Sequence, residues 1–571
     1  MRYKGNAASE GIAIGRVLQY RAYTAKVEKK EIDPGEIEQE KVRWRTACER
    51  AKEELRALCK TLEQTDPDKA AIFEAHQDIV QDVALEEDIV GEIEDGGCNA
   101  EWATAKIYDR YARRLEKAAD ERMRARAADL YDVKNRILRC CEGKAEKNLS
   151  ALEQPVVVMA HDLFPSDTAT LDRKNVLGIV TEVGGQTSHS AIIARSYGIP
   201  ALLGVTGCME QVQEGTQVCV DAVDGELITE PDAAYLAALQ EKKTVFEQVR
   251  EDTERYRREE GRTADGTRIE VELNVGDPNE KELSASAYTD GVGLFRTEFL
   301  YMGRRDLPDE DEQAEVYRRV LESFRGKPVI LRTLDIGGDK KLESMQLPSE
   351  ENPFLGNRAL RLCLEHKEMF RTQLRACLRA SVYGQLWLMF PMVGGLEDLR
   401  AAKEQLEQAK KELDARGERY SKDVKVGIMV EIPSVALIAE AVAAESDFAS
   451  IGTNDLTQYT LAADRMSPSV SEYYRFYHPS LFRLIGNVAT AYRRQGKPVS
   501  VCGEMGGDPA AAAALVGLGI RRLSMGSSSV PRIKKMLSKL RIEDMEGLAV
   551  QAQALSTEAE VRAMLQAAVT L

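Results

Sequence analysis

Long apolar runs are absent from the sequence, and this absence excludes one class of protein. No stretch of the 571 residues approaches the roughly 18 consecutive apolar residues that a membrane-spanning helix needs. The first residues, MRYKGNAASEGIAIG, lack the apolar core of a secretory signal peptide. We therefore expect a cytoplasmic protein that does not insert into a membrane.

Positively charged residues are also fewer than negatively charged ones. The chain carries 78 Lys and Arg against 94 Asp and Glu, which gives a formal net charge of −16. Because such a surface repels polyanions, we expect neither nucleic-acid binding nor binding to anionic membranes. A small anionic substrate is still compatible with this charge, since it needs only a local basic cluster.

Paired cysteines are missing as well. The chain has ten cysteines but no CxxC pair and no repeated zinc-type spacing. Cys140 and Cys141 are adjacent and cannot readily bridge to each other. The composition therefore favours reduced thiols, as in a cytoplasmic protein.

The length predicts two to four domains, and the residue pattern changes several times along the chain. Residues 1–20 and 148–230 contain short β-branched runs bounded by Gly, Asp and Pro, which predict one α/β domain. Residues 21–147 interrupt it with about four amphipathic helices. The stretch IDPGEIEQE predicts that the first of these helices begins at Pro34, with Asp33 as its N-cap.

The remaining chain predicts a linker and a barrel. Residues 231–260 are charged and helical and lack Gly and Pro after Pro231, so we expect a stiff helical linker. Residues 261–571 alternate eight apolar runs with helical stretches. Eight such strands predict a (β/α)₈ TIM-type barrel, and an open doubly wound sheet is the alternative.

Charged residues follow the predicted barrel strands repeatedly. Arginines converging on one mouth suit an anionic ligand, because guanidinium groups match phosphate and carboxylate. Glu431 and Asp455, on neighbouring strands, suit Mg²⁺ together with substrate oxygens. The alternative is a set of Arg–carboxylate pairs that only closes the barrel top. The strand-end residues are Arg296, Glu298, Arg332, Asp335, Glu431, Asn454, Asp455, Cys502 and Glu504, and Arg465 follows the sixth strand.

Cys502 lies at the end of the seventh predicted strand, in SVCGEMGG. A cysteine in an apolar strand is most often a small core residue. At a barrel mouth it can instead act as an acid or a nucleophile, because a thiol with a pKa near 8.5 keeps its proton at neutral pH.

His189 is one of only five histidines and lies in EVGGQTSHSAIIARSYG, after a glycine pair and in the first turn of a predicted helix. A helix N-terminus favours an anion, and neutral imidazole is a competent nucleophile at pH 7. Thr187, Ser188 and the backbone N–H groups could bind phosphate oxygens, and Gly184 and Gly185 leave room for that approach. Helix capping, core packing and metal binding are the alternatives. A Ser–His catalytic pair is weaker, because no GxSxG motif is present.

These motifs together resemble a known family along essentially the whole chain. The chain is similar to Enzyme I of the bacterial phosphoenolpyruvate-dependent sugar phosphotransferase system. GGQTSHSAIIAR resembles its phosphohistidine motif. Six further stretches of this chain resemble the barrel motifs of the family: LFRTEFLYM, LRTLDIGGDK, ENPFLGNRALR, GIMVEIPS, SIGTNDLTQYTLAADR and VCGEMGGDP.

The resemblance implies a role for each matching residue. His189 matches the phosphorylated histidine, and Cys502 matches the residue that protonates the departing enolate to give pyruvate. The other matches bind phosphoenolpyruvate (Arg296, Arg332, Arg358, Arg465, Asn454 and Asp455) or Mg²⁺ (Glu431 and Asp455). Two departures from the family pattern are Gln186, where arginine is common, and MSPSVSEYY after Arg465.

The resemblance also implies partners and motion. The phosphoryl group would pass from His189 to the phosphocarrier protein HPr, which would dock on the helical insertion at 21–147. The α/β domain would swivel about the 231–260 linker, with hinges at the linker ends, and the barrels would form a homodimer. The rival interpretations are a pyruvate phosphate dikinase or phosphoenolpyruvate synthase, and a non-catalytic regulatory homologue.

Overall fold

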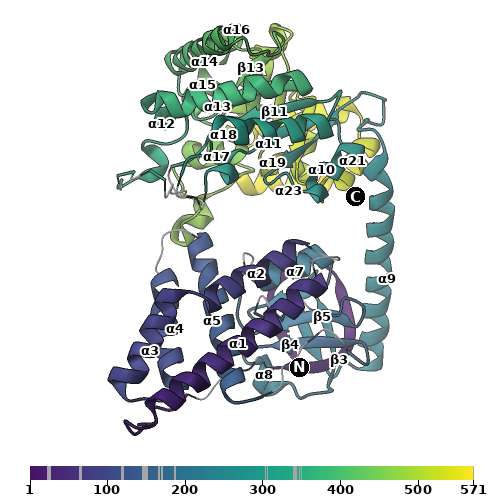
Figure 1. The fold of residues 1–571 in the computed structure, drawn as a ribbon. Coiled ribbons are helices and arrows are strands. Elements are labelled where there is room, and N and C mark those ends of the chain that lie inside the picture. Colours follow the sequence, from purple (N-terminus) through teal and green to yellow (C-terminus); the bar gives the residue numbers. More distant parts are fainter. Residues whose placement is uncertain are drawn as a thin grey trace. The chain divides into compact units, whose positions relative to one another are not determined.

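A computed structural model of the chain divides into two compact units, Met1–Gln248 and Val249–Leu571, which are described separately. Figure 1 shows the elements of each unit. The structure describes residues 1–571 except 22, 24–26, 63–66, 117–120, 145–148, 150–151, 165–166, 169–170, 186–187, 303, 305, 338–343, 346, 349 and 570–571.

The first unit contains an eight-stranded sheet in the order β1-β8-β7-β3-β4-β5-β6-β2. Strands β3 to β6 are parallel to one another, and the outer pairings are antiparallel. All five residues of β4 are buried, and they alternate between two hydrophobic clusters, so both faces of the sheet are covered. The strands are β1 (Arg2–Lys4), β2 (Asn6–Ser9), β3 (Ile12–Tyr20), β4 (Val156–Ala160), β5 (Val176–Thr181), β6 (Ala201–Leu203), β7 (Gln217–Asp221) and β8 (Glu226–Thr229), with helices α7 (His189–Tyr197) and α8 (Cys208–Gln211).

The helical segment between β3 and β4 contains five described helices, where the sequence predicted about four. The amphipathic pattern of residues 68–94 predicts one of these helices, but the structure breaks it at Asp82, whose carboxylate accepts hydrogen bonds from the N–H groups of Ala84 and Leu85 and so caps a new helix. The first helix begins at Ile37 and not at Pro34, because residues 34–36 form a turn that Pro and Gly favour. The helices are α1 (Ile37–Leu62), α2 (Pro67–Val80), α3 (Val83–Gly96), α4 (Ala100–Glu116) and α5 (Glu121–Cys141).

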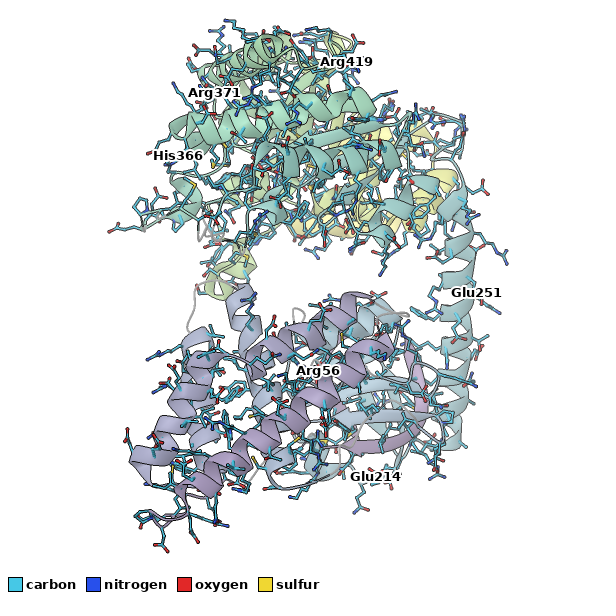
Figure 2. All side chains as sticks on the ribbon, viewed as in Figure 1. Arg56, Glu214, Glu251, His366, Arg371 and Arg419 are labelled. Carbon is cyan, nitrogen blue, oxygen red and sulfur yellow. The ribbon has the colours of Figure 1, made fainter. Side chains whose placement is uncertain are left out.

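Helix α9 (Ala233–Arg255) is the predicted helical linker. In the first unit, Leu239 of α9 is buried in a small apolar cluster against the sheet, and Lys242 forms ion pairs with Asp221 and Asp224. In the second unit, the last turns of α9 are bound through Lys535, whose ammonium lies 3.0 Å from Asp252. Glu251, labelled in Figure 2, lies in the exposed stretch between these contacts.

The second unit is a closed barrel of eight parallel strands in the order β9 to β16, and β16 pairs with β9. All eight predicted strands are present, and closure excludes the open doubly wound sheet. The strands are β9 (Glu270–Val275), β10 (Val292–Phe295), β11 (Pro328–Arg332), β12 (Gln385–Phe390), β13 (Lys425–Val430), β14 (Phe448–Ile451), β15 (Val499–Val501) and β16 (Arg522–Met525).

Helices surround the barrel, and their apolar faces pack with the outward-facing strand residues in one large core. The α-helices are α10 (Glu280–Leu283), α11 (Glu310–Ser323), α12 (Leu360–Glu365), α13 (Lys367–Ala380), α14 (Leu396–Arg416), α15 (Pro433–Leu437), α16 (Ala439–Glu445), α17 (Thr453–Leu461), α18 (Pro479–Arg494), α19 (Glu504–Gly507), α20 (Pro509–Gly517), α21 (Val530–Lys539), α22 (Ile542–Ala554) and α23 (Glu558–Ala568). The 3₁₀ turns are η1 (Tyr256–Arg258), η2 (Ser284–Ala287), η3 (Glu298–Leu300), η4 (Pro353–Leu355), η5 (Ser381–Tyr383) and η6 (Pro468–Tyr473).

Charged side chains close the barrel near the amino ends of its strands. Arg522 forms ion pairs with Glu270, at 2.5 Å, and with the fully buried Glu272. The Arg522 guanidinium lies 4.7 Å and the Lys425 ammonium 4.2 Å from the centre of the Trp387 ring. This barrel floor therefore combines a buried ion-pair cluster with two cation–π contacts.

Two expectations from composition can be compared with the structure. Among the described residues, no helix is both long enough and apolar enough to cross a membrane. All ten cysteines lie in the described part of the chain, and each is a free thiol.

The barrel floor leads to a stability prediction. We expect Arg522→Met to lower the free energy of unfolding of the barrel unit by about 3–5 kcal/mol, because it leaves Glu272 buried without its cation. Chemical denaturation followed by Trp387 fluorescence measures this, since Trp387 is the one tryptophan of residues 249–571.

The double variant Glu272→Met/Arg522→Met serves as the control. It removes both buried charges, so its loss of stability should be clearly smaller than that of Arg522→Met alone. An Arg522→Met protein as stable as the parent would contradict the importance of this ion pair.

Candidate active site at the barrel mouth

The carboxyl ends of five barrel strands carry the predicted site residues. Arg332 is the last residue of β11, and Glu431 directly follows β13. Cys502 directly follows β15, and helix α17 after β14 begins with Thr453, so Asn454 and Asp455 lie in its first turn. The carboxyl ends of the strands face one side of a barrel, where active sites of this fold lie.

A single carboxylate links two of the buried arginines. Asp335 Oδ2 lies 2.8 Å from Arg332 Nη1, and Asp335 Oδ1 lies 2.8 Å from Arg358 Nη2. All three side chains are at most 7% exposed, so each charge depends on the others for compensation. Burial alone would lower the pKa of both guanidinium groups, but Asp335 and further carboxylates raise it above the usual value.

Glu298 and Asp455 extend this ion-pair network in opposite directions. Glu298 Oε1 lies 3.0 Å from Arg332 Nη2, and both side chains are buried. Asp455 Oδ2 lies 3.6 Å from Arg358 Nη2, while its Oδ1 lies 3.1 Å from Arg465 Nη1. Five of the predicted strand-end residues and Arg358 are therefore in one connected network.

Glu431 lies beside this network but has no cation in direct contact among the described residues. Its Oε1 accepts a hydrogen bond of 2.6 Å from the N–H group of Met392. Burial and the neighbouring charges of Asp455 and Asp335 raise the pKa of Glu431 to about 8. Glu431 is therefore a buried carboxylate without an ion-pair partner in the described part of the chain.

A buried carboxylate without an ion-pair partner fits a divalent cation at Glu431 and Asp455. No cluster of three or more acidic, histidine or cysteine ligands occurs among the described residues, so the protein supplies few ligands itself. Mg²⁺ is commonly held by one or two carboxylates and completed by substrate oxygens and water. The donor set at the mouth therefore fits Mg²⁺ bound together with an anionic substrate.

Gly503, which follows Cys502, allows the chain after β15 to approach the first turn of α17 closely. The side-chain carbonyl oxygen of Asn454 accepts a hydrogen bond of 3.0 Å from the backbone N–H group of Glu504. A Cβ atom at Gly503 would lie 1.9 Å from Thr453 Oγ1 and 2.7 Å from Thr453 N, so only glycine permits this approach. The backbone that follows β15 therefore packs directly on the first turn of α17.

The thiol of Cys502 is buried at this junction. Burial raises the pKa of Cys502 to about 11, and the nearby arginines Arg332 and Arg296 only partly counter that effect. The group is therefore a protonated thiol at neutral pH, which is the form that an acid needs.

Arg296 differs from the other predicted arginines. It directly follows β10, and its side chain is exposed, whereas Arg332 and Arg358 are buried. Among the described residues it has no ion pair, so its charge is available to a ligand. The segment 338–343, within the motif LRTLDIGGDK, lies outside the described residues.

Two polar residues of the site were missed by the sequence analysis. Gln373 of α13 accepts a hydrogen bond from Leu334 N and donates one to Thr297 Oγ1, which ties β10 to β11 behind the arginines. Tyr459 of α17 contacts Arg358 through its hydroxyl group. Both residues belong to ordinary amphipathic helix patterns, so no local sequence signal distinguishes them.

In the first unit, His189 is the first residue of α7, as predicted. Ser188 is the N-cap, and its hydroxyl accepts a hydrogen bond of 3.3 Å from Ala191 N. Gly184 adopts a φ of +108°, which few other residues tolerate. Gln186, Thr187 and the side chain of His189 lie outside the described part of the structure.

A second histidine lies next to this turn. His161 follows β4 and Glu182 follows β5, and the His161 Nδ1 atom lies 2.8 Å from Glu182 Oε2. Since β4 and β5 are parallel neighbours, the pair occupies the same edge of the sheet as the turn that leads to α7. The sequence analysis did not select either residue.

Comparisons with known proteins match three successive segments of the chain. Three family models match it: the N-terminal domain of PEP-utilising enzymes at residues 4–126, their mobile domain at 152–225 and their PEP-binding domain at 250–542. A phosphoenolpyruvate-protein phosphotransferase of Priestia megaterium is 45% identical over 544 residues, which is 95% of both chains. The chain belongs to this family. A relative of the same name from Bacillus subtilis is 43% identical over 99% of both chains.

Two more proteins are similar to the chain. The phosphoenolpyruvate-protein phosphotransferase of Staphylococcus aureus is 42% identical over 98% of both chains. A solution structure described as Enzyme I is 39% identical, covers 43% of this chain and has a TM-score of 0.39. The family members are transferases, and this chain is an enzyme of that class.

The close approach at Gly503 leads to a prediction. We expect Gly503→Ala to lower the free energy of unfolding of the barrel unit by about 1–3 kcal/mol, because the added methyl group overlaps the Thr453 backbone. Gly526→Ala is the matched control, since an added Cβ there meets nothing within 4 Å. Equal denaturation midpoints for the two variants would show that the packing at Gly503 is loose.

Proposed function

We propose that the chain transfers the phosphoryl group of phosphoenolpyruvate to His189 and then to a histidine of the phosphocarrier protein HPr, with release of pyruvate. The relatives are named for phosphoenolpyruvate as donor and protein as acceptor. The observation that carries the proposal is the mouth of the barrel, where several arginines are held near the buried carboxylate of Glu431, which has no ion-pair partner in the described part of the chain. That arrangement suits a ligand with a phosphate, a carboxylate and a bound metal ion.

The arginines bind and orient the substrate in this proposal. Arg296, Arg332, Arg358 and Arg465 neutralise the phosphate and carboxylate groups, and Asn454 adds a hydrogen bond. Phosphoryl transfer needs this neutralisation and an in-line arrangement more than covalent chemistry. Because Asp335 already holds the guanidinium groups of Arg332 and Arg358 in place, these two side chains need little rearrangement when the substrate binds.

Glu431 and Asp455 would hold Mg²⁺. When bound, the metal ion supplies charge neutralisation for the substrate oxygens. Its arrival would also favour the ionised carboxylate of Glu431, which the protein environment alone disfavours.

His189 is the acceptor. Its neutral imidazole nitrogen attacks phosphorus, the bond from phosphorus to the enol oxygen breaks, and the enolate of pyruvate leaves. The first turn of α7 offers free N–H groups and the positive end of the helix dipole to the new phosphate. The hydroxyl of Ser188 still has its hydrogen to donate, since it acts only as an acceptor toward Ala191.

Cys502 is the acid that completes the reaction. The thiol gives its proton to the methylene carbon of the enolate, so pyruvate forms and a thiolate remains. Arg332 and Arg296 favour that thiolate electrostatically, and solvent returns the proton after pyruvate leaves. Protonation at carbon makes the overall transfer favourable because it removes the enolate.

His189 and the mouth belong to different units, so the proposal requires motion. We propose that the first unit swivels, which brings His189 to the mouth and later to HPr on the helical segment between β3 and β4. The first half of α9 is bound to the first unit through Lys242, and its last turns are bound to the second unit through Lys535. We place the hinges of this motion at the ends of the 231–260 linker. The domain boundaries predicted from the sequence remain part of this proposal.

Further parts of the proposal concern the setting of the enzyme. We propose a cytoplasmic homodimer joined through the barrels. A dikinase or synthase would require a nucleotide for turnover, and a regulatory homologue would release no pyruvate. Pyruvate release from phosphoenolpyruvate and HPr without nucleotide therefore distinguishes all three.

The acceptor assignment leads to a prediction. Wild-type protein incubated with ³²P-labelled phosphoenolpyruvate and Mg²⁺ should carry an acid-labile, base-stable label at His189, and chelation of the metal should prevent labelling. His189→Ala should show no label but bind phosphoenolpyruvate as the wild type does, because the mouth is unchanged. Label on another side chain, or persistent label in the variant, would refute the assignment.

A separate prediction concerns Cys502. We expect Cys502→Ala to keep its fold and substrate affinity while pyruvate release falls at least a hundredfold, in the range of a lost general acid. Cys363→Ala is the control, since that thiol is equally buried but lies in the helix α12. Unchanged turnover in Cys502→Ala would return this residue to a packing role.

A further inference from the structure

Strained backbone conformations gather at the barrel mouth. Among the described residues, four other than glycine have a positive φ, and three of them belong to the barrel unit: Ala359, Met392 and Ala462. Ala359 directly follows Arg358, and Met392 donates its N–H group to Glu431. Residues other than glycine rarely adopt such conformations, and where they do the surrounding structure must hold them there.

The hydroxyl group of Tyr459 contacts several of these segments. It donates a hydrogen bond of 2.7 Å to the carbonyl oxygen of Phe354 and accepts one of 3.2 Å from Arg358 Nη1. The sulfur atom of Met392 lies 3.7 Å away. Tyr459 itself lies three residues before Ala462, where α17 ends. One phenol therefore connects α17 with the Arg358–Ala359 segment and with Met392.

The contacts of Arg358 explain what this hydroxyl does. One arm of the guanidinium fork, Nη2, is held by Asp335. The other arm, Nη1, has Tyr459 as its hydrogen-bond partner, and Arg358 Nε is buried with no partner in the described part of the chain. The ring of Phe354 lies 5.5 Å from the guanidinium carbon, and the carbonyl group of the same residue is anchored by Tyr459.

Removal of the hydroxyl would therefore release two constraints together. Nη1 would lose its partner, and the η4 turn that places the Phe354 ring beside the guanidinium would lose its tether. The guanidinium would then be held by the carboxylates of Asp335 and Asp455 alone, which leaves rotation of the fork about the Asp335 contact possible.

We infer that Tyr459 is a positioning residue for the substrate: its hydroxyl group fixes the plane of the Arg358 guanidinium so that one edge of the fork faces the bound anion. The inference rests on the proposed function and adds a residue to it. Tyr459 acts through Arg358 and not by contact with the reacting atoms.

The test is the affinity for phosphoenolpyruvate in the absence of turnover. Tyr459→Phe should weaken binding about tenfold in a His189→Ala background, the range expected for loss of a hydrogen bond to a charged group. Tyr492→Phe is the matched control: it removes a buried hydroxyl bonded to Ser446 Oγ at 2.7 Å, elsewhere in the same unit. That control should bind phosphoenolpyruvate as tightly as its parent, although both variants lose a hydrogen-bonded tyrosine hydroxyl group.

A double-mutant cycle separates positioning from general stability. In an Arg358→Lys background, Tyr459→Phe should change the affinity less than twofold, because the group that it positions is gone. Two results would overturn the inference. One is an affinity of Tyr459→Phe within twofold of its parent, and the other is a full tenfold loss of affinity on Tyr459→Phe in the Arg358→Lys background. A wild-type protein that neither binds nor turns over phosphoenolpyruvate would overturn the proposed function and this inference together.

Discussion

The Asp335 carboxylate between two buried guanidinium groups is the interaction on which the barrel mouth depends. It sets the spacing of Arg332 and Arg358 before any ligand arrives, at 2.8 Å from each. Two arginines buried side by side repel each other, so the shared carboxylate is what keeps both charged and inside. The preorganised positive charge that phosphoryl transfer requires is therefore a property of the folded protein and not of the complex.

The barrel itself was predictable because its signal is local. Each strand is a short apolar run that ends in polar residues, and the fold brings those ends to one side, so Arg332, Glu431 and Cys502 were identified from position alone. The break of the helical stretch at Asp82 was missed, although aspartate is a preferred N-cap residue, because the amphipathic pattern of 68–94 was interpreted as one continuous helix. The three-residue strand β6 was missed, because so short a run has no period to detect.

The residues that support the site were not predictable in the same way. Gln373 and Tyr459 reach the mouth from helices, and their importance arises from partners 39 or more positions away in the chain. A hydrogen bond between residues that are distant in the chain produces no recognisable pattern in the sequence around either residue. The charge balance at Glu431 is likewise a property of three carboxylates that meet only in the folded chain.

The burial of Cys502 has a consequence for oxidative stress. Peroxides and disulfides react with thiolates, and a thiol whose pKa is about 11 is almost never in that form inside a cell. The burial that keeps this thiol protonated therefore also makes Cys502 a poor target for hydrogen peroxide. An enzyme whose cysteine acts as an acid can keep working under oxidising conditions that would inactivate one whose cysteine acts as a nucleophile.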